Sequence, residues 1–262
     1  MRRLLVDLHL HTVLSPCAEI EMIPPLIVQR AVELGLGIIA VTDHNCAANV
    51  RAVIDAARHT SLVVLSGMEV QTREEVHMLC LFDTPEQDDQ WQNTVWAALP
   101  RMPNNAALFG EQYVVDDTGE YMYTEDRMLA TSISLSVEQV VAGVNALGGI
   151  CLPAHIDRPS YSLLGNLGFI PPGLPIAGVE ISHLTTPRKI VQLFPQLARY
   201  GMVTDGDAHR LAEMAALTQV QLEAATVPEL RLALAKQGER RCDILVSTPV
   251  ATHRNQATLS EE

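Results

Sequence analysis

Short apolar runs alternate with amphipathic stretches in the N-terminal part of the chain. Apolar runs at 6–10, 38–41 and 61–70 predict strands, and the stretches 27–36 and 47–58 predict helices between them. Pro24 and Pro25 suit the start of the first helix, and Gly35 suits its end. Strands that alternate with helices over short links favour parallel pairing and an α/β fold.

The next apolar run starts near His77 and predicts a strand that cannot pair in parallel with the one before it. Only eight positions separate Glu69 from His77, too few for a parallel crossover, which takes about a dozen residues. The two strands should therefore form a hairpin that makes Glu69 and His77 neighbours.

Residues 84–135 are predicted to be an insertion. A polar helix near 86–98 is followed by two β-prone runs around 116–119, which predict a hairpin. We expect this segment to act as a lid, with Arg101, Tyr113 and Tyr123 as candidate substrate contacts. The remaining pattern predicts helices and strands within one domain, 1–248, and a polar tail at 249–262. The helices are at 136–147, 188–199 and 227–237, and the strands at 150–155, 176–182, 201–204 and 218–224.

Composition narrows the class of protein. The 262 residues are 48% hydrophobic, enough for a large core, but no apolar run approaches the roughly 20 residues that span a bilayer. The N-terminus has no signal-peptide core, so a cytoplasmic location is expected. Five scattered cysteines without a CxxC pair argue against a disulfide framework. A net charge of −13 argues against a general nucleic-acid binder but leaves a short oligonucleotide open.

Acidic residues and histidines gather where the predicted strands end. On a strand, residues i and i+2 face the same side, so His9 and His11 present two imidazoles together. In a β/α barrel the carboxyl ends of the strands meet at one mouth. Singly, His44 and Asp207 would also fit as helix caps, but the whole set favours a site for zinc, manganese or iron rather than calcium. The candidate ligands are His9, His11, His44, Glu69, His77, His155, Asp207 and His209.

Five segments together resemble the PHP (polymerase and histidinol phosphatase) domain family. They are DLHLHT at 7–12, TDHN at 42–45, GMEV with VHML at 67–79, PAH at 153–155 and GDAH at 206–209. The resemblance implies a distorted (β/α)7 TIM-like barrel that holds two to three divalent metal ions. His9, His11, Glu69 and Asp207 would hold the first ion. Glu69 would bridge to a second, completed by His77 and His155, and His44 and His209 would hold a third.

The first loop departs from the family pattern at Cys17. Three-metal relatives have a histidine ligand at the corresponding place. A cysteine thiolate is a good ligand for zinc or iron and a poor one for manganese. The alternative is that Cys17 is a small buried loop residue, in which case the third site is weak or empty.

The ligand set predicts hydrolysis of a phosphate ester by a metal-activated water that attacks phosphorus in line. Arg158 could clamp a phosphate oxygen or form a surface salt bridge. His183 could protonate the leaving group or be a structural histidine. Asp7 and Asp43, which precede ligands, could orient imidazoles.

The favoured substrate is a small phosphorylated metabolite or nucleotide, hydrolysed as a phosphomonoester. One alternative is a phosphodiesterase or exonuclease on short nucleic acids, and the other is a metal-binding module without catalysis. No membrane partner is expected, and the sequence does not indicate an oligomeric state.

Overall fold

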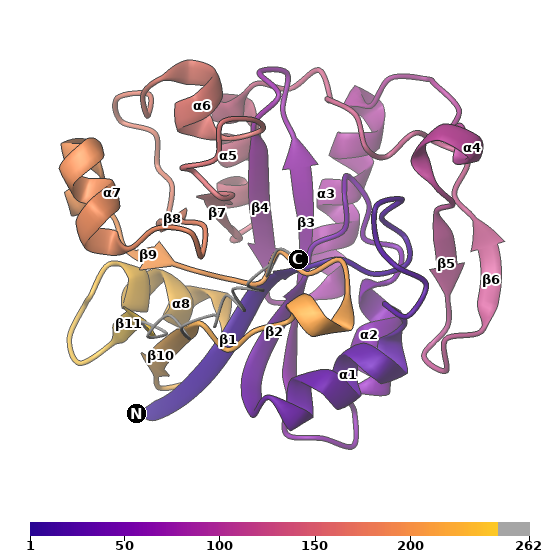
Figure 1. Ribbon diagram of the computed structural model, residues 1–262, viewed down its shortest axis with the longest axis horizontal. Helices are drawn as coiled ribbons and strands as arrows, with labels where there is room; N and C mark the ends of the chain where they lie inside the picture. Colours follow the sequence, from indigo (N-terminus) through magenta and orange to yellow (C-terminus); the bar gives the residue numbers. More distant parts are fainter. Residues whose placement is uncertain (246–262) are drawn as a thin grey trace, which may run out of the picture.

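A curled sheet of seven strands forms the centre of the molecule. The computed structural model describes residues 1–245, and the tail predicted for 249–262 lies outside this range. The strand order in the sheet is β11-β10-β1-β2-β3-β4-β7, and β8 and β9 form a separate pair, as do β5 and β6 (Figure 1). The strands are β1 (Arg2–Leu10), β2 (Leu36–Val41), β3 (Val63–Gln71), β4 (His77–Phe82), β5 (Tyr113–Val115), β6 (Tyr121–Thr124), β7 (Ile150–Pro153), β8 (Val179–Glu180), β9 (Met202–Val203), β10 (Thr218–Leu222) and β11 (Arg241–Ile244).

Helices cover this sheet and link its strands. They are α1 (Pro24–Glu33), α2 (Val50–Ala56), α3 (Pro85–Ala98), α4 (Ala106–Phe109), α5 (Val137–Ala146), α6 (Leu163–Leu167), α7 (Pro187–Leu193) and α8 (Val227–Leu234), with short 3₁₀ turns η1 (Pro195–Arg199) and η2 (Leu211–Glu213). Within the described range, none of these helices has both the length and the apolar character needed to cross a bilayer.

The first three strands pair in parallel, as the alternating pattern predicts. β1 pairs with β2 and β2 with β3. α1 has Pro24 in its first turn, where the missing N–H is not needed. It buries Ile27 and Ala31 in one apolar cluster with Leu10 and Val41 of the sheet. This packing fixes the ends of β1 and β2 side by side, where the histidine-bearing loops begin.

Several pairs in the sheet are antiparallel. The predicted hairpin is confirmed, because β3 and β4 pair antiparallel with Gln71 opposite His77. β7 also runs antiparallel to β4, and β10 and β11 join antiparallel beyond β1. The link from β4 to β7 carries the insertion, so it is long enough to return to either end of the sheet. β11 was not predicted; its short sequence Arg-Cys-Asp-Ile lacks a clear alternating pattern.

One predicted helix is wrong in extent. The helix expected at 188–199 ends at Leu193, and a 3₁₀ turn takes over from Pro195. Proline has no N–H to donate and clashes with the preceding turn, so it interrupts an α-helix.

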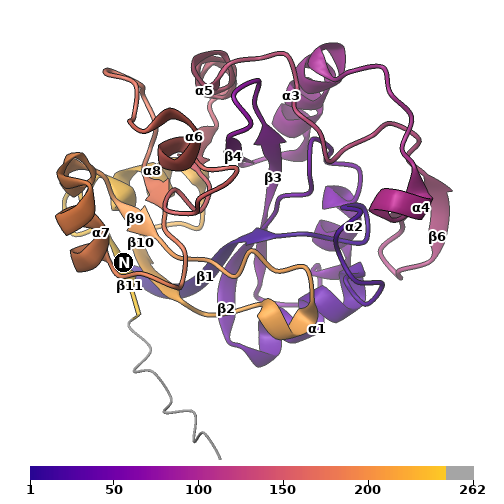
Figure 2. The same cartoon turned by 45° about the horizontal axis from the view of Figure 1, so that its top comes forward.

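The insertion has the predicted polar helix, α3, and the predicted hairpin, β5–β6. Figures 1 and 2 place this hairpin on the opposite side of the molecule from β8 and β9. Two asparagines that follow β2 form hydrogen bonds with the insertion. Asn45 donates to the backbone carbonyls of Leu129 and Thr131, and Asn49 donates to that of Tyr113. The insertion is thus anchored beside the loop after β2, and its role as a lid stays a prediction.

Candidate metal centre

β1 ends in two buried histidines that point to one place. His9 lies in the strand, His11 follows it, and both side chains are fully buried. Their Nε2 atoms are 3.3 Å apart. The His9 Nε2 atom also lies 3.2 Å from Oε1 of Glu69 and 3.2 Å from Oδ1 of Asp207. The two-residue period of the strand therefore brings both imidazoles together, as predicted.

Glu69, in β3, lies at the centre of the cluster. Its Oε1 atom is 2.8 Å from Nδ1 of His77 and 3.5 Å from Nε2 of His155. Its Oε2 atom is 3.0 Å from Nδ1 of His44. Burial would raise the pKa of Glu69, but the charges of His77, His9 and His44 outweigh burial and hold that pKa well below its usual range. Glu69 is therefore a buried carboxylate surrounded by imidazoles.

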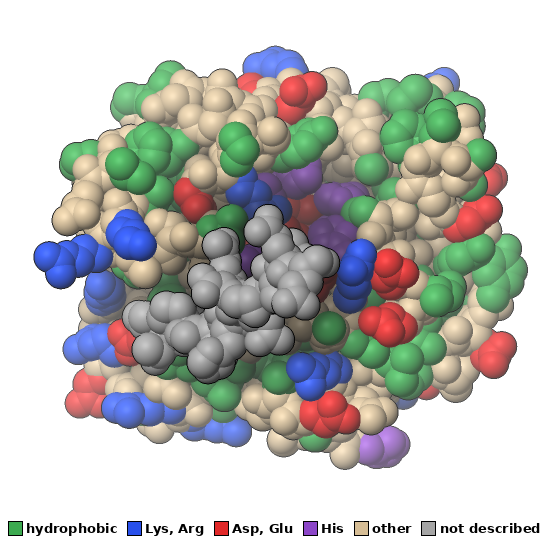
Figure 3. Space-filling view, in the orientation of Figure 1, with side chains coloured by type: hydrophobic (Ala, Val, Ile, Leu, Met, Phe, Trp, Pro, Cys, Tyr) green, Lys and Arg blue, Asp and Glu red, His purple; other side chains and the backbone are tan. Residues whose placement is uncertain are grey.

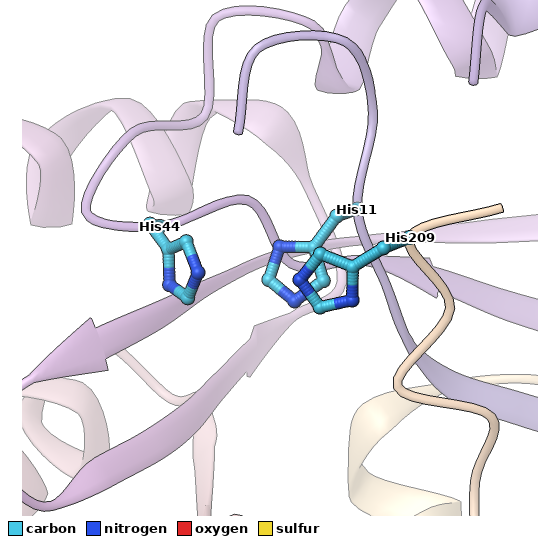
Figure 4. A group of neighbouring side chains, drawn as sticks. All are labelled: His11, His44 and His209. Carbon is cyan, nitrogen blue, oxygen red and sulfur yellow. The ribbon is translucent and has the colours of Figure 1, made fainter. Parts of the chain in front are cut away.

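The segment after β9 completes the cluster with Asp207 and His209. The ring of His209 stacks on that of His11, with centroids 4.2 Å apart, and the ring of His44 lies 4.6 Å from His11 and 6.3 Å from His209. Figure 4 shows these three imidazoles close together, although they come from three separate segments. Asp207 and His155 have φ angles of 47° and 28°, a conformation that residues other than glycine seldom adopt. The local backbone is thus held in an uncommon shape at two candidate ligands.

The donor atoms of this cluster fit metal ions. Within residues 1–245, Nε2 of His77 and Nδ1 of His155 are buried without a hydrogen bond, although buried polar atoms usually have partners. Imidazoles combined with carboxylates are typical ligands of zinc, manganese and iron. Three overlapping groups have ligand atoms within 4.8 Å of one another: His9, His11 and Glu69; His11, His44 and His209; and His44, Glu69 and His77.

The electrostatics of His9 also favour a cation. Burial lowers the pKa of His9, but the charges of Asp207, Glu180 and Glu69 outweigh burial and raise it well above its ordinary value. These carboxylates therefore favour positive charge at this point of the fold.

Glu180 orients two candidate ligands and was missed in the sequence. Its carboxylate accepts a hydrogen bond from Nδ1 of His9, at 3.1 Å, and one from the backbone N–H of His155, at 2.7 Å. An ionised carboxylate only accepts, so Nδ1 of His9 carries a hydrogen and Nε2 faces the cluster. Glu180 ends β8, and the pattern of acidic residues at strand ends is the signal that could have predicted it.

Asp43 supports His11 through the first loop rather than directly. Its carboxylate accepts hydrogen bonds from the backbone N–H and the hydroxyl of Thr12 and from the Ser15 hydroxyl, each at 2.7 Å. Ser15 Oγ lies 2.9 Å from Nδ1 of His11. Asp7 instead accepts from the backbone of Gly206, beside Asp207. The two aspartates thus hold backbone and loop groups that carry the candidate ligands.

Cys17 lies beside His44 and His209, where the sequence comparison with the PHP family placed it. The residue is exposed at the surface. Desolvation of the sulfur raises the pKa of the thiol, but the neighbouring imidazoles of His209 and His44 outweigh this effect and lower that pKa to about 7. A thiol with this pKa is partly ionised near neutral pH, which is the form that binds metal. The structure thus brings all nine candidate ligands to one region.

A cavity of about 290 Å³ opens above these side chains. Figure 3 shows histidines gathered in a hollow on this face. The cavity contains Arg158, whose Nη1 atom donates to Oδ2 of Asp207 at 2.6 Å. His183 is exposed and lies in a different pocket, beside Thr204 and Leu217, so the structure does not bring it to the cluster. The lining of the first cavity comprises His44, Glu69, His77, His155, Arg158, Pro159, Ser160, Tyr161, Asp207 and His209.

Comparison with known protein families agrees with this site. The family model of the PHP domain matches residues 7–159, more than half of the chain. The chain belongs to the PHP domain family. The resemblance predicted from the motifs is thereby confirmed. Asp207 and His209 lie beyond the matched range, and it is the fold of this PHP domain that returns them to the cluster. Membership supports the prediction of a metal-dependent phosphoesterase at the level of the class and leaves its substrate open.

Solved structures share the fold of this PHP domain at low sequence identity. The lesion-specific endonuclease PfuEndoQ from Pyrococcus furiosus has a TM-score of 0.67 and 18% identity, over 92% of this chain and 58% of the endonuclease. A protein from Bifidobacterium adolescentis, assigned as a metal-dependent phosphoesterase, has a TM-score of 0.54 and 21% identity, over 78% of this chain and 87% of its own. PsfC from Pseudomonas syringae has a TM-score of 0.58 and 16% identity, over 94% of this chain and 93% of PsfC.

These similarities confirm the predicted distorted TIM-like barrel of the α/β class. The chain spans 58% of the endonuclease, so the likeness concerns one part of that protein. No curated protein matches the sequence significantly.

Proposed function

We propose that this PHP domain hydrolyses a phosphomonoester of a small metabolite or nucleotide. The observation that carries the proposal is the convergence of six imidazoles and two carboxylates in one cluster, four of whose imidazoles line a cavity that also holds an arginine. Such a cluster is suited to cations, and cations together with a guanidinium suit the binding of a phosphate ester.

The contacts in the cluster support the distribution of ligands implied by the family. His9 and His11 contact the carboxylate of Glu69 and also lie within 3.5 Å of Asp207, whereas His77 and His155 contact Glu69 alone of the two carboxylates. We assign these two groups to a pair of ions that share Glu69. When bound, divalent ions would lower the pKa of a water molecule and offset the charge that develops on the phosphoryl group.

A third ion is assigned to His44, His209 and Cys17. The proximity of the thiol to both imidazoles, which lowers its pKa, supports this assignment. A thiolate at this place favours zinc or iron over manganese. We expect zinc-loaded protein to hold three ions per chain and the Cys17→Ala variant to hold two, as measured by elemental analysis. Three ions retained by the variant would remove Cys17 from the ligand set.

Arg158 is the residue that we assign to the substrate phosphate. One of its N–H groups is held by Asp207, which fixes the guanidinium over the floor of the cavity. The planar fork of an arginine offers further donors at fixed directions, and these can bind phosphate oxygens. The general acid predicted at His183 has no such support, because that side chain lies in another pocket.

Phosphodiester hydrolysis remains the second candidate. The endonuclease Q complex with a duplex carrying an abasic lesion has the same fold, with a TM-score of 0.63 over 92% of this chain. The cavity of this PHP domain is open at the surface, so a chain end could enter it. The net charge of −13 disfavours a long nucleic acid.

Release of inorganic phosphate from a panel of monoesters and a 5′-phosphorylated oligonucleotide tests the proposal, with zinc, manganese and iron supplied in turn. We expect turnover of a small monoester. Asp207→Ala should abolish it, whereas His59→Ala, at an exposed histidine outside the cluster, should leave it unchanged. Cleavage of diesters alone would support the second candidate. A folded protein that binds metal but has no turnover would support a metal-binding module without catalysis.

A further inference from the structure

Tyr161 is an exposed aromatic residue at the rim of the cavity, and none of the roles assigned so far uses it. Its side chain is 48% exposed, whereas Glu69 at the floor of the same cavity is 0% exposed. Its ring packs on that of His77, with centroids 4.9 Å apart and planes inclined by 28°. One face of the ring is thus covered by a candidate ligand, and the exposed part belongs to the cavity lining.

The backbone of Tyr161 is held in an unusual conformation. Its φ angle is 56°, the left-handed region that a large side chain rarely adopts. Its carbonyl accepts a hydrogen bond from the backbone N–H of His77 at 2.9 Å. The surrounding contacts therefore maintain a strained conformation that orients the ring, and backbone strain of this kind is often kept for function.

The loop that carries Tyr161 is held in place by α6. Ser162 is buried and caps α6 by accepting from the Gly165 N–H at 2.9 Å, and its hydroxyl also bonds the carbonyl of Arg158. A side chain at Gly165 would lie 2.8 Å from the carbonyl oxygens of Arg158 and Pro159. The helix therefore packs tightly against the loop, and Arg158 and Tyr161 have fixed positions in one wall. Such a rigid wall is a preformed binding surface.

We propose that Tyr161 is a stacking subsite for the base of a nucleoside phosphate whose phosphate lies on the floor of the cavity. The difference in depth supports a nucleoside rather than a ring joined directly to phosphate. The candidate ligands are buried, whereas Tyr161 lies at the exposed rim, and a substrate with a sugar between the phosphate and the ring fits this arrangement. Planar bases stack on aromatic side chains with little dependence on their identity. This inference rests on the proposed phosphoesterase and specifies its substrate class.

Two substrates that differ only in the base test the subsite, namely AMP and ribose 5-phosphate. We expect the native protein to have the higher kcat/KM for AMP. Tyr161→Leu removes the ring and keeps an apolar side chain of similar reach. It should lower kcat/KM for AMP by about 5- to 100-fold, the range for loss of one base stack. The value for ribose 5-phosphate should fall less than that for AMP, because this substrate has no base to stack on the ring. Tyr161→Phe should retain the native preference.

An equal loss of kcat/KM for both substrates would show a structural role of Tyr161 and overturn the subsite. An unchanged preference for AMP in Tyr161→Leu would overturn it too. Equal kcat/KM values of the native protein for ribose 5-phosphate and AMP would also overturn the subsite, and the proposed phosphoesterase activity would stand.

Calorimetric binding of a methylene phosphonate analogue of AMP to the metal-loaded protein separates the subsite from the reaction. Weaker binding to Tyr161→Leu than to native protein, with no hydrolysis of any monoester, would retain the subsite and remove the proposed function. No binding to native protein would overturn the subsite.

Discussion

At the scale of single residues, the cluster depends on groups that set the orientation of the imidazoles. Glu180 is the clearest example, because one buried carboxylate holds both the ring of His9 and the backbone of His155. Hydrogen bonds of this kind fix which nitrogen of a histidine faces the metal. The candidate ligands are therefore only part of the site that the fold has to build.

We expect Glu180→Gln to lower zinc affinity by about 10- to 100-fold, the usual effect of losing such a partner. The amide keeps the shape of the side chain but no longer holds Nδ1 of His9 with a full negative charge. Competition with a chromophoric chelator measures the affinity. Glu239→Gln, at an exposed glutamate, is the matched control. Equal zinc affinities of Glu180→Gln and native protein, with unchanged melting, would contradict the positioning role.

A second residue, Asp88 in α3, affects stability away from the site. It is buried, and neither carboxylate oxygen has a hydrogen-bond partner among the described residues. Burial, and secondly the charge of Asp89, raise the pKa of Asp88 well above its usual range. The folded protein thus binds the proton more tightly than the unfolded chain. Asp88 therefore destabilises the fold increasingly as pH rises from its unfolded pKa, about 4, to its folded pKa.

Asp88→Asn should raise the free energy of unfolding at pH 8 by about 1–3 kcal/mol, because the amide carries no charge to be desolvated. The gain should shrink toward pH 4, where the carboxyl is protonated in the folded state and largely regains its proton in the unfolded chain. Urea unfolding at the two pH values measures it, with the exposed Asp117→Asn as control. A gain that grows on acidification would contradict the assigned pKa direction.

At the scale of elements, the site depends on contacts between the insertion and the loops after β1 and β2. The Asn49 amide donates to the Thr12 hydroxyl at 2.9 Å and to the carbonyl of Tyr113 at 3.0 Å, and its oxygen accepts from the N–H of Val115 at 3.0 Å. One buried side chain thereby joins the first loop, α2 and β5. The positions of the loops that carry the histidines are thus coupled to the position of the β5–β6 hairpin.

Asn49→Ala should lower the free energy of unfolding by about 1–3 kcal/mol, because buried backbone groups of β5 lose their partner. It should also make the insertion more sensitive to proteolysis without a change in the barrel. Urea unfolding and limited proteolysis measure the two effects. The exposed Gln192→Ala serves as the control amide. Native resistance to proteolysis in Asn49→Ala would argue that other contacts hold the insertion.

At the scale of the whole molecule, the cluster joins distant parts of the chain. Its side chains come from β1, β3 and β4 and from the segments that follow β2, β7 and β9. Ions bound there would contact several segments of the folded state at once. Metal binding should therefore be coupled to global stability.

We expect zinc to raise the melting temperature by several degrees and chelator to reverse the shift. A ligand at about 100 times its Kd stabilises the state that it binds by about 2.7 kcal/mol. Differential scanning calorimetry of native protein, Asp207→Ala and His59→Ala, each with zinc or chelator, measures the effect. The shift should be smaller in Asp207→Ala only. Identical melting with and without zinc would argue against an occupied metal site.

The sequence by itself determined the first half of the fold and most of the candidate ligands. Alternating apolar and amphipathic runs predicted β1, β2, β3 and their helices, because local burial patterns repeat with the period of each element. The short link between Glu69 and His77 left only a hairpin. The two-residue period of β1 predicted that His9 and His11 would face the same side.

Only the tertiary structure decided what depends on distant contacts. Glu180 shares the pattern of acidic strand ends, but its pairing with His9 was decided by the fold, because their hydrogen bond joins positions far apart in the chain. The antiparallel pairing of β7 with β4 depends on the end of the sheet at which the chain re-enters after the long insertion. Local periodicity does not encode this end. The placement of Tyr161 on His77, and of His183 outside the cavity, follows from packing of loops between elements. Residue type and spacing set the chemistry available, and the fold selected which side chains meet.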